Sequence, residues 1–226
     1  MTTTLTAAVG LSIAFLGLPG LSSLRDRLDA FDESRWDARV LSDLSKWVVT
    51  GLLIGYLLAI EADSLSSIGV AFPEAIPPGI GPSGPAGLVA WWIAGTVGTA
   101  ALTSVVYVVY DRFGFTIPGE FVEDQATRSY PAMLLTAVTA GVTESVLYGA
   151  YPIERLAAVT GSVVAAAAIT WLVFTAVHYA GDTFSLEEVV YIGAPALSVT
   201  VLYVLSGSLL VIVLVHSTVN TLSFVT

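Results

Sequence analysis

The sequence predicts an all-α membrane protein, a polytopic bundle of about seven transmembrane helices. Hydrophobic residues make up 55% of the 226 residues and charged residues only 12%, which lies outside the range of ordinary soluble domains. The mean hydropathy of +0.83 points the same way. The apolar residues also occur in blocks of roughly 20, the length that an α-helix needs to cross a bilayer. The membrane is therefore the expected solvent of this chain.

Polar connections divide the chain into seven apolar segments. One connection, with the sequence AFPEAIPPGIGPSGPAG, contains too much proline and glycine to be helical. The expected spans are residues 4–22, 44–62, 87–110, 130–152, 158–180, 188–205 and 207–225.

The distribution of basic residues predicts the orientation of these spans. With seven spans, the first and third connections lie on the same side of the membrane, and seven of the eight basic residues fall there: Arg25, Arg27, Arg35, Arg39, Lys46, Arg112 and Arg128. Arg155 alone is on the other side. By the positive-inside rule we expect a multi-pass cell-membrane protein with its N-terminus outside and its C-terminus in the cytoplasm.

The remaining composition excludes several kinds of site. The chain has no cysteine, which excludes disulfides, thiolate nucleophiles and cysteine metal ligands. Its net charge of −10 comes from acidic connections and leaves no basic patch for nucleic acid. Acidic surfaces beside a single lysine favour a halophilic source, because concentrated salt screens the repulsion among carboxylates.

Four polar residues in the apolar spans require an explanation. They are Glu144, His178, His216 and Asn220, and they include both histidines of the chain. A charged residue at the centre of a membrane helix costs roughly 2.5–3.5 kcal/mol on insertion scales. His216 and Asn220 are four residues apart and therefore share one helix face. A carboxylate, two imidazoles and a carboxamide on three helices can therefore point toward one interior position.

Such a cluster suits the activation of water. A carboxylate in a low-dielectric site is a usable general base near neutral pH. Imidazole and carboxamide groups either ligate a divalent metal or donate hydrogen bonds to an oxyanion. The alternative interpretation is an interhelical hydrogen-bond network that only fixes the packing.

Three segments carry a resemblance to a known family. TESVLYGAYPIERL at 143–156, FTAVH at 174–178 and HSTVN at 216–220 follow one another in this order on three of the predicted helices. In order and spacing they resemble the EExxxR, FxxxH and HxxxN motifs of the CPBP (CAAX protease and bacteriocin-processing) family of intramembrane proteases. The resemblance implies a four-helix protease core over 130–226, preceded by N-terminal transmembrane helices and polar loops over 1–129, which we interpret as additional packing helices.

Carried over to this chain, the resemblance implies an intramembrane endopeptidase that hydrolyses a membrane-associated peptide or protein within the lipid. Glu144 is then the catalytic carboxylate that activates water, with His178 beside it. His216 and Asn220 would hold a metal or stabilise the oxyanion. Glu144, His178 and His216 would form a ligand set for a divalent metal such as zinc, with one open position. A metal-free mechanism would instead use His216 and Asn220 as the oxyanion hole. The oligomeric state is not predicted.

The first motif departs from the family pattern. Ser145 and Gly149 replace its second glutamate and its arginine. Because both charged residues are absent, neither leaves an unpaired charge in the bundle. In the family pattern, however, the glutamate–arginine pair would orient the catalytic residues. The alternative function is therefore a non-cleaving pseudoprotease that binds or scaffolds a membrane partner. A transporter that uses Glu144 for proton coupling is a third alternative, against which the chain shows no internal repeat.

The predicted boundaries also leave a question of depth. They place Glu144 near the outer end of its span and His178 near the cytoplasmic end. A helix that continued to about residue 157, or a strongly tilted helix, would bring the two closer in depth.

Overall fold

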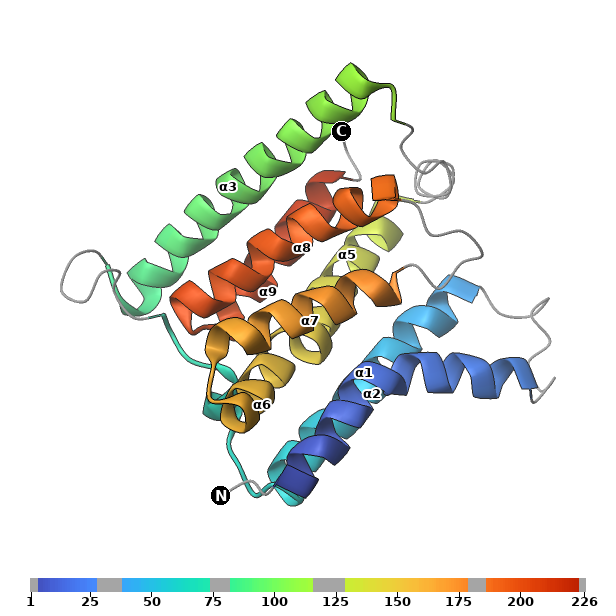
Figure 1. Cartoon of the computed structure of the whole chain (residues 1–226), viewed down its shortest axis with the longest axis vertical. Coiled ribbons are helices and arrows are strands. Elements are labelled where there is room, and N and C mark those ends of the chain that lie inside the picture. The colour runs from blue at the N-terminus through green and yellow to red at the C-terminus, as the bar shows by residue number, and fades with distance from the viewer. Residues whose placement is uncertain (1–3, 28–37, 74–81, 116–128, 179–185, 224–226) are drawn as a thin grey trace.

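The computed structural model describes residues 4–27, 38–73, 82–115, 129–178 and 186–223, and these residues form helices joined by short connections (Figure 1). Within these ranges there is no strand. The elements are α1 (Thr4–Arg27), α2 (Ala38–Ala59), the 3-10 turn η1 (Leu65–Ile68), α3 (Gly84–Phe113), α5 (Tyr130–Ser145), the π-helical turn η2 (Val146–Ala150), α6 (Tyr151–Thr160), α7 (Val163–Val177), α8 (Leu186–Ser206) and α9 (Leu209–Ser223).

The expected polytopic helical bundle is confirmed. Five helical segments of the described chain are long and apolar enough to cross a membrane, and α7 and α9 are shorter apolar helices. Helices are the expected form for such segments, because lipid offers no hydrogen-bond partner to an open backbone. Large apolar side chains also lie on the outside of the bundle, including Leu52, Val108 and Val164, each more than 60% exposed.

One span differs in length from its prediction. α5, η2 and α6 form a single segment from Tyr130 to Thr160, whereas we expected the span to end at residue 152. Pro152 does not end the helix, although proline has no N–H and its ring clashes with the preceding turn. The wider π-helical turn accommodates it: the N–H of Tyr151 bonds the carbonyl of Val146, five residues earlier.

The helices are arranged around this long segment. α5 packs most extensively against α9, α3 packs against α8 and α9, and α1 packs against α2 and α6. Figure 1 shows α3 on one side of the bundle and the α1–α2 pair on the other, with α5 to α9 between them. α1 begins at the lower end of the bundle in this view, and α9 ends toward the upper end (Figure 1).

A glycine brings α5 and α9 into unusually close contact. A Cβ atom placed on Gly141 would lie 2.7 Å from the backbone nitrogen of Ser217 and 2.8 Å from its Cα. Real Cβ atoms do not approach backbone atoms so closely, so only glycine permits this spacing. The contact lies one turn before Glu144 on α5 and next to His216 on α9.

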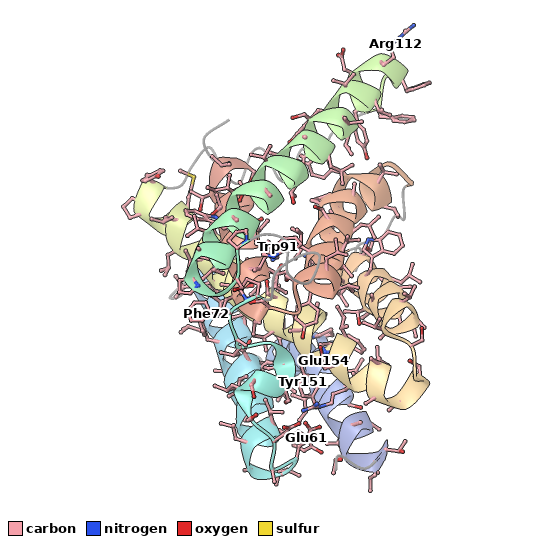
Figure 2. All side chains as sticks on the ribbon, turned by 90° about the vertical axis from the view of Figure 1, so that its left-hand side faces the viewer. Glu61, Phe72, Trp91, Arg112, Tyr151 and Glu154 are labelled. Atoms are coloured by element: carbon pink, nitrogen blue, oxygen red, sulfur yellow. The ribbon has the colours of Figure 1, made fainter. Side chains whose placement is uncertain are left out.

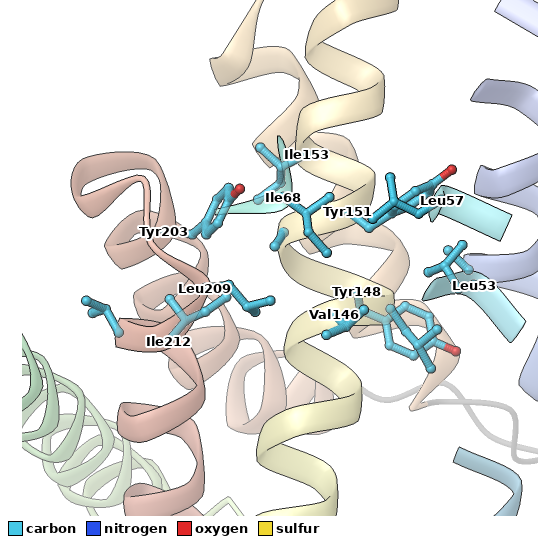
Figure 3. Close-up of a cluster of buried hydrophobic side chains, with 14 of the residues drawn as sticks. Leu53, Leu57, Ile68, Val146, Tyr148, Tyr151, Ile153, Tyr203, Leu209 and Ile212 are labelled. Carbon is cyan, nitrogen blue, oxygen red and sulfur yellow. The ribbon is translucent and has the colours of Figure 1, made fainter. Parts of the chain in front are cut away.

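The hydrophobic core surrounds η2 and the start of α6 (Figure 3). Leu53 and Leu57 of α2 reach it from one side, and Leu209 and Ile212 of α9 reach it from another. Tyr151 of α6 is fully buried among them. The core therefore fixes the place where α5 passes through η2 into α6.

A cluster of ion pairs ties this segment to the connection after α2. The guanidinium of Arg155 lies 2.7 Å from Glu61 and 3.0 Å from Asp63. The hydroxyl of Tyr151 donates to the other oxygen of Glu61 at 2.8 Å, and the Arg155 guanidinium lies 5.2 Å from the centre of the Tyr151 ring. Figure 2 shows Glu61 and Tyr151 close together where α6 meets this connection.

Candidate active site

Glu144 lies next to the π-helical turn, near the middle of the Tyr130–Thr160 span. π-Helical turns inside α-helices occur frequently at functional sites. Because the helix continues to Thr160, Glu144 is not near the end of its span as the predicted boundaries implied. The helix therefore continues past residue 157, which favours a smaller difference in depth between Glu144 and His178.

The carboxylate of Glu144 contacts two different helices. Its Oε1 accepts a hydrogen bond from the ammonium of Lys46 on α2 at 2.6 Å. Its Oε2 faces Nε2 of His216 on α9 at 3.9 Å, which is too long for a direct hydrogen bond. The side chain of Glu144 is only 9% exposed, so the carboxylate lies inside the bundle with one oxygen bonded and the other directed at an imidazole.

The two histidines both lie close to one aromatic ring. The centre of the Phe174 ring is 4.4 Å from that of His178 and 6.4 Å from that of His216. Tyr148 of η2 packs edge-on against the same phenylalanine at 5.8 Å. Both histidines also interact electrostatically with Glu144. The structure thus brings His178 and His216 together beside Phe174, within electrostatic range of Glu144.

The hydrogen bond of His178 defines its tautomer. Its Nδ1 lies 2.8 Å from the carbonyl oxygen of Phe174, and a carbonyl only accepts, so Nδ1 carries the proton. Nε2 of a neutral His178 is therefore available as an acceptor. His178 is exposed at the end of α7, whereas the side chain of His216 is only 14% exposed.

Asn220 is less closely connected to the other predicted residues. It lies one turn beyond His216 on α9 and is half-buried. Within the described part of the chain its carboxamide has no hydrogen-bond partner, whereas its backbone carbonyl accepts from Ser223. The structure places it on the helix that carries His216, but shows no contact that joins its side chain to Glu144.

The two positions that depart from the family motif lie inside the site. Ser145 is buried, and its hydroxyl is 3.4 Å from Nδ1 of His216. Gly149 belongs to η2, and a Cβ there would approach Ile212 to 3.2 Å. Neither residue carries a charge, so the segment 145–149 brings no cation to Glu144.

The expected metal ligands do not form a metal site in this arrangement. Among the described residues, no three His, Cys, Asp or Glu side chains are grouped so that they could hold a metal ion. One oxygen of Glu144 is also already bonded to an ammonium group. A bound divalent metal therefore stays a prediction, and the steps proposed below use only the residues of this chain.

Lys46 is the site residue that the sequence analysis missed. We counted it among the basic residues of the first connection and interpreted the N-terminal helices as packing elements. The structure corrects this interpretation, because Lys46 lies within α2 and reaches Glu144 across 98 positions of sequence. A signal was present: it is the only lysine of the chain and falls inside the predicted span 44–62.

The comparison with protein families concerns the C-terminal part of the chain. Residues 126–222 match the family described as type II CAAX prenyl endopeptidase Rce1-like. No curated protein and no solved structure matches the chain. The matched segment contains Glu144, His178, His216 and Asn220, and Lys46 lies outside it. The match agrees with the resemblance drawn from the three motifs: residues 126–222 are similar to the Rce1-like family.

Proposed function

We propose that this protein is an intramembrane endopeptidase in which Glu144 activates a water molecule for attack on a peptide bond of a membrane-associated peptide or protein. The family match supports a protease-type enzyme. The observation that carries the finer proposal is the arrangement of Glu144, a buried carboxylate with one oxygen held by Lys46 and the other facing His216.

The proposed reaction requires no group beyond those of the site. Glu144 accepts a proton from water as the water oxygen attacks the carbonyl carbon of the substrate. The negative charge that develops on the carbonyl oxygen is stabilised by N–H donors of His216 and Asn220. When the intermediate collapses, the C–N bond breaks and Glu144 returns its proton to the departing nitrogen.

The test is hydrolysis by the purified protein in lipid vesicles. The substrates are fluorogenic peptides anchored in the same vesicles, half of them carrying a prenylated C-terminal cysteine. We expect wild type to cleave at least one class and Glu144→Gln to lose roughly 10²–10⁴-fold in kcat, because the carboxamide cannot accept the proton. Glu154→Gln is the matched control, since Glu154 lies on the same span but accepts a hydrogen bond from Tyr203 instead.

A second candidate function is a non-cleaving membrane binding or scaffolding protein. Two observations favour it: Ser145 and Gly149 replace charged motif residues, and the ammonium of Lys46 already occupies one oxygen of the proposed base. If wild type and Glu144→Gln are equally inert toward every peptide while both remain folded, this candidate replaces the protease.

We also propose that the N-terminus is outside and the C-terminus is cytoplasmic. Two of the eight basic residues are held in ion pairs inside the bundle, Lys46 with Glu144 and Arg155 with Glu61. The other six all belong to the first and third connections, which supports a cytoplasmic location for both. Because the chain has no cysteine, single-cysteine variants report location directly. A membrane-impermeant maleimide should label Ser66→Cys in intact cells and should label Gln125→Cys only after lysis; the reverse pattern would contradict this orientation.

A further inference from the structure

α2 contacts α5 through three polar side chains on one of its faces. Asp43 accepts a hydrogen bond from Thr136 at 2.9 Å, and the indole N–H of Trp47 donates to Thr139 at 3.1 Å. The third contact is the hydrogen bond from Lys46 to Glu144. Positions 43, 46 and 47 are three and four residues apart, so they lie on the same side of the helix.

Of these three contacts, only that of Lys46 reaches the candidate active site. The Lys46 side chain is 21% exposed and lies within the first two turns of the span that begins at Val40. An ammonium group inside a membrane helix is costly unless it is paired. Asp43 lies one turn away, yet the Nζ atom of Lys46 bonds Glu144 on the neighbouring helix. The only lysine of the chain is therefore paired with Glu144, the proposed catalytic base.

The ion pair with Lys46 gives Glu144 the positively charged partner that the motif segment 143–156 does not provide. The segment that follows Glu144 carries Ser145 and Gly149, neither of which is charged. No described residue outside α2 forms an ion pair with Glu144 other than His216, whose nitrogen lies 3.9 Å away. Lys46 thus provides the strong hydrogen-bond donor to Glu144, and it does so from a helix outside the segment that matches the family.

We propose that Lys46 is a positioning residue for Glu144, so that the catalytic site is completed by α2 rather than by the Rce1-like segment alone. By holding Oε1, the ammonium fixes the rotation of the carboxylate and keeps Oε2 directed at His216. It also compensates the charge of Glu144, whose side chain is only 9% exposed. This inference rests on the proposed function for its catalytic consequence, whereas the pairing itself is testable without any activity.

The catalytic test uses three variants in the vesicle assay. Lys46→Met keeps the length and apolar character of the side chain but removes the charge, and should lower kcat about 100-fold or more with little change in KM. Lys46→Arg keeps a cationic donor for the carboxylate and should recover most of the lost kcat. Trp47→Phe is the matched control, because it removes a neighbouring α2–α5 hydrogen bond without touching Glu144, and its kcat should stay close to that of wild type.

The pairing is tested separately by thermal unfolding of the same proteins in detergent. We expect Lys46→Met to lower Tm, and the double variant Lys46→Met/Glu144→Gln to have a higher Tm than Lys46→Met alone, because it leaves no unpaired carboxylate. Strictly additive effects would overturn the pairing, whether or not the protein is an active protease.

The remaining outcomes separate the two proposals. If wild type cleaves and Lys46→Met keeps its kcat, or if Trp47→Phe loses as much kcat as Lys46→Met, the positioning role is overturned while the protease stands. If wild type cleaves no peptide but the Tm effects are non-additive, the proposed function fails and Lys46 is retained as the partner of Glu144 without a catalytic role.

Discussion

Glu61 and Glu144 are both buried carboxylates that pair with a cation distant in the sequence, but their oxygens are bonded to different extents. Each oxygen of Glu61 has a donor at 2.9 Å or less, from Tyr151 on one side and from Arg155 on the other. Glu144 has one such donor, and its second oxygen is 3.9 Å from the nearest imidazole nitrogen.

On the proposed function, this difference separates a structural ion pair from a reactive one. A carboxylate with both oxygens bonded gains stability from its surroundings, and fewer of its acceptor sites remain for a substrate or for water. A carboxylate with one oxygen held and the other unbonded is both oriented and available. We therefore attribute stability to the Arg155 cluster and propose that Glu144 takes part in the chemistry. The following variants test this difference, from the largest expected effect to the smallest.

The largest effect on stability is expected for Arg155→Met. It leaves Glu61 as a buried charge without its cation, and such a loss costs about 3–5 kcal/mol of unfolding free energy. Adding Glu61→Gln should restore part of this stability. Denaturation of the purified variants in detergent measures both effects. A double variant no more stable than Arg155→Met would argue that the cluster is not held by its charges.

A smaller effect is expected for Gly141→Ala. The added methyl group meets the backbone of Ser217, and such overpacking typically costs about 1–3 kcal/mol. Because the contact adjoins Glu144 and His216, the activity should also fall. Gly98→Ala is the control, since a Cβ there would meet no atom within 4 Å apart from the adjacent backbone of its own helix. Equal effects of the two substitutions on stability and on kcat would contradict the close α5–α9 contact.

Tyr203→Phe should have a still smaller effect, on stability alone. The Tyr203 hydroxyl donates to Glu154 at 2.8 Å, and a hydrogen bond to a charged group contributes about 1.5–3 kcal/mol, less when the acceptor is partly solvated. We expect a stability loss at or below the lower end of that range and an unchanged kcat. A fall in kcat without a fall in Tm would show that the Glu154 region takes part in the reaction.

The smallest effect is a pH dependence at Asp63, which lies in the connection after α2. The backbone N–H of Ser64 and the Arg155 guanidinium hold the pKa of Asp63 below its usual value. A carboxyl with a lowered folded-state pKa stabilises the fold above its unfolded value of about 3.9, and this contribution disappears as the pH falls through the folded value. Asp63→Asn should therefore flatten the loss of Tm below pH 4. An unchanged acid slope would rule out this contribution.

Much of the architecture follows from local properties of the chain. The seven apolar segments were predictable because the exclusion of water from lipid requires each spanning segment to bond its own backbone. Glu144, His178 and His216 were recognisable for the same reason, since an ionisable side chain in an apolar helix requires an explanation. The family motifs then supplied their order. The halophilic source, the metal and the division at residue 130 stay predictions.

The sequence alone therefore determined the fold class and three of the residues gathered at the site, whereas the tertiary structure decided how these residues are paired. The ion pair between Lys46 and Glu144 joins positions 98 residues apart, and the bonds of Arg155 to Glu61 join positions 94 apart. The continuation of the helix past Pro152 depends on a π-helical turn held in the core. Hydropathy indicates which segments lie in lipid. Which side chains form ion pairs depends on which helix faces contact each other, and the packing of the whole bundle decides those contacts.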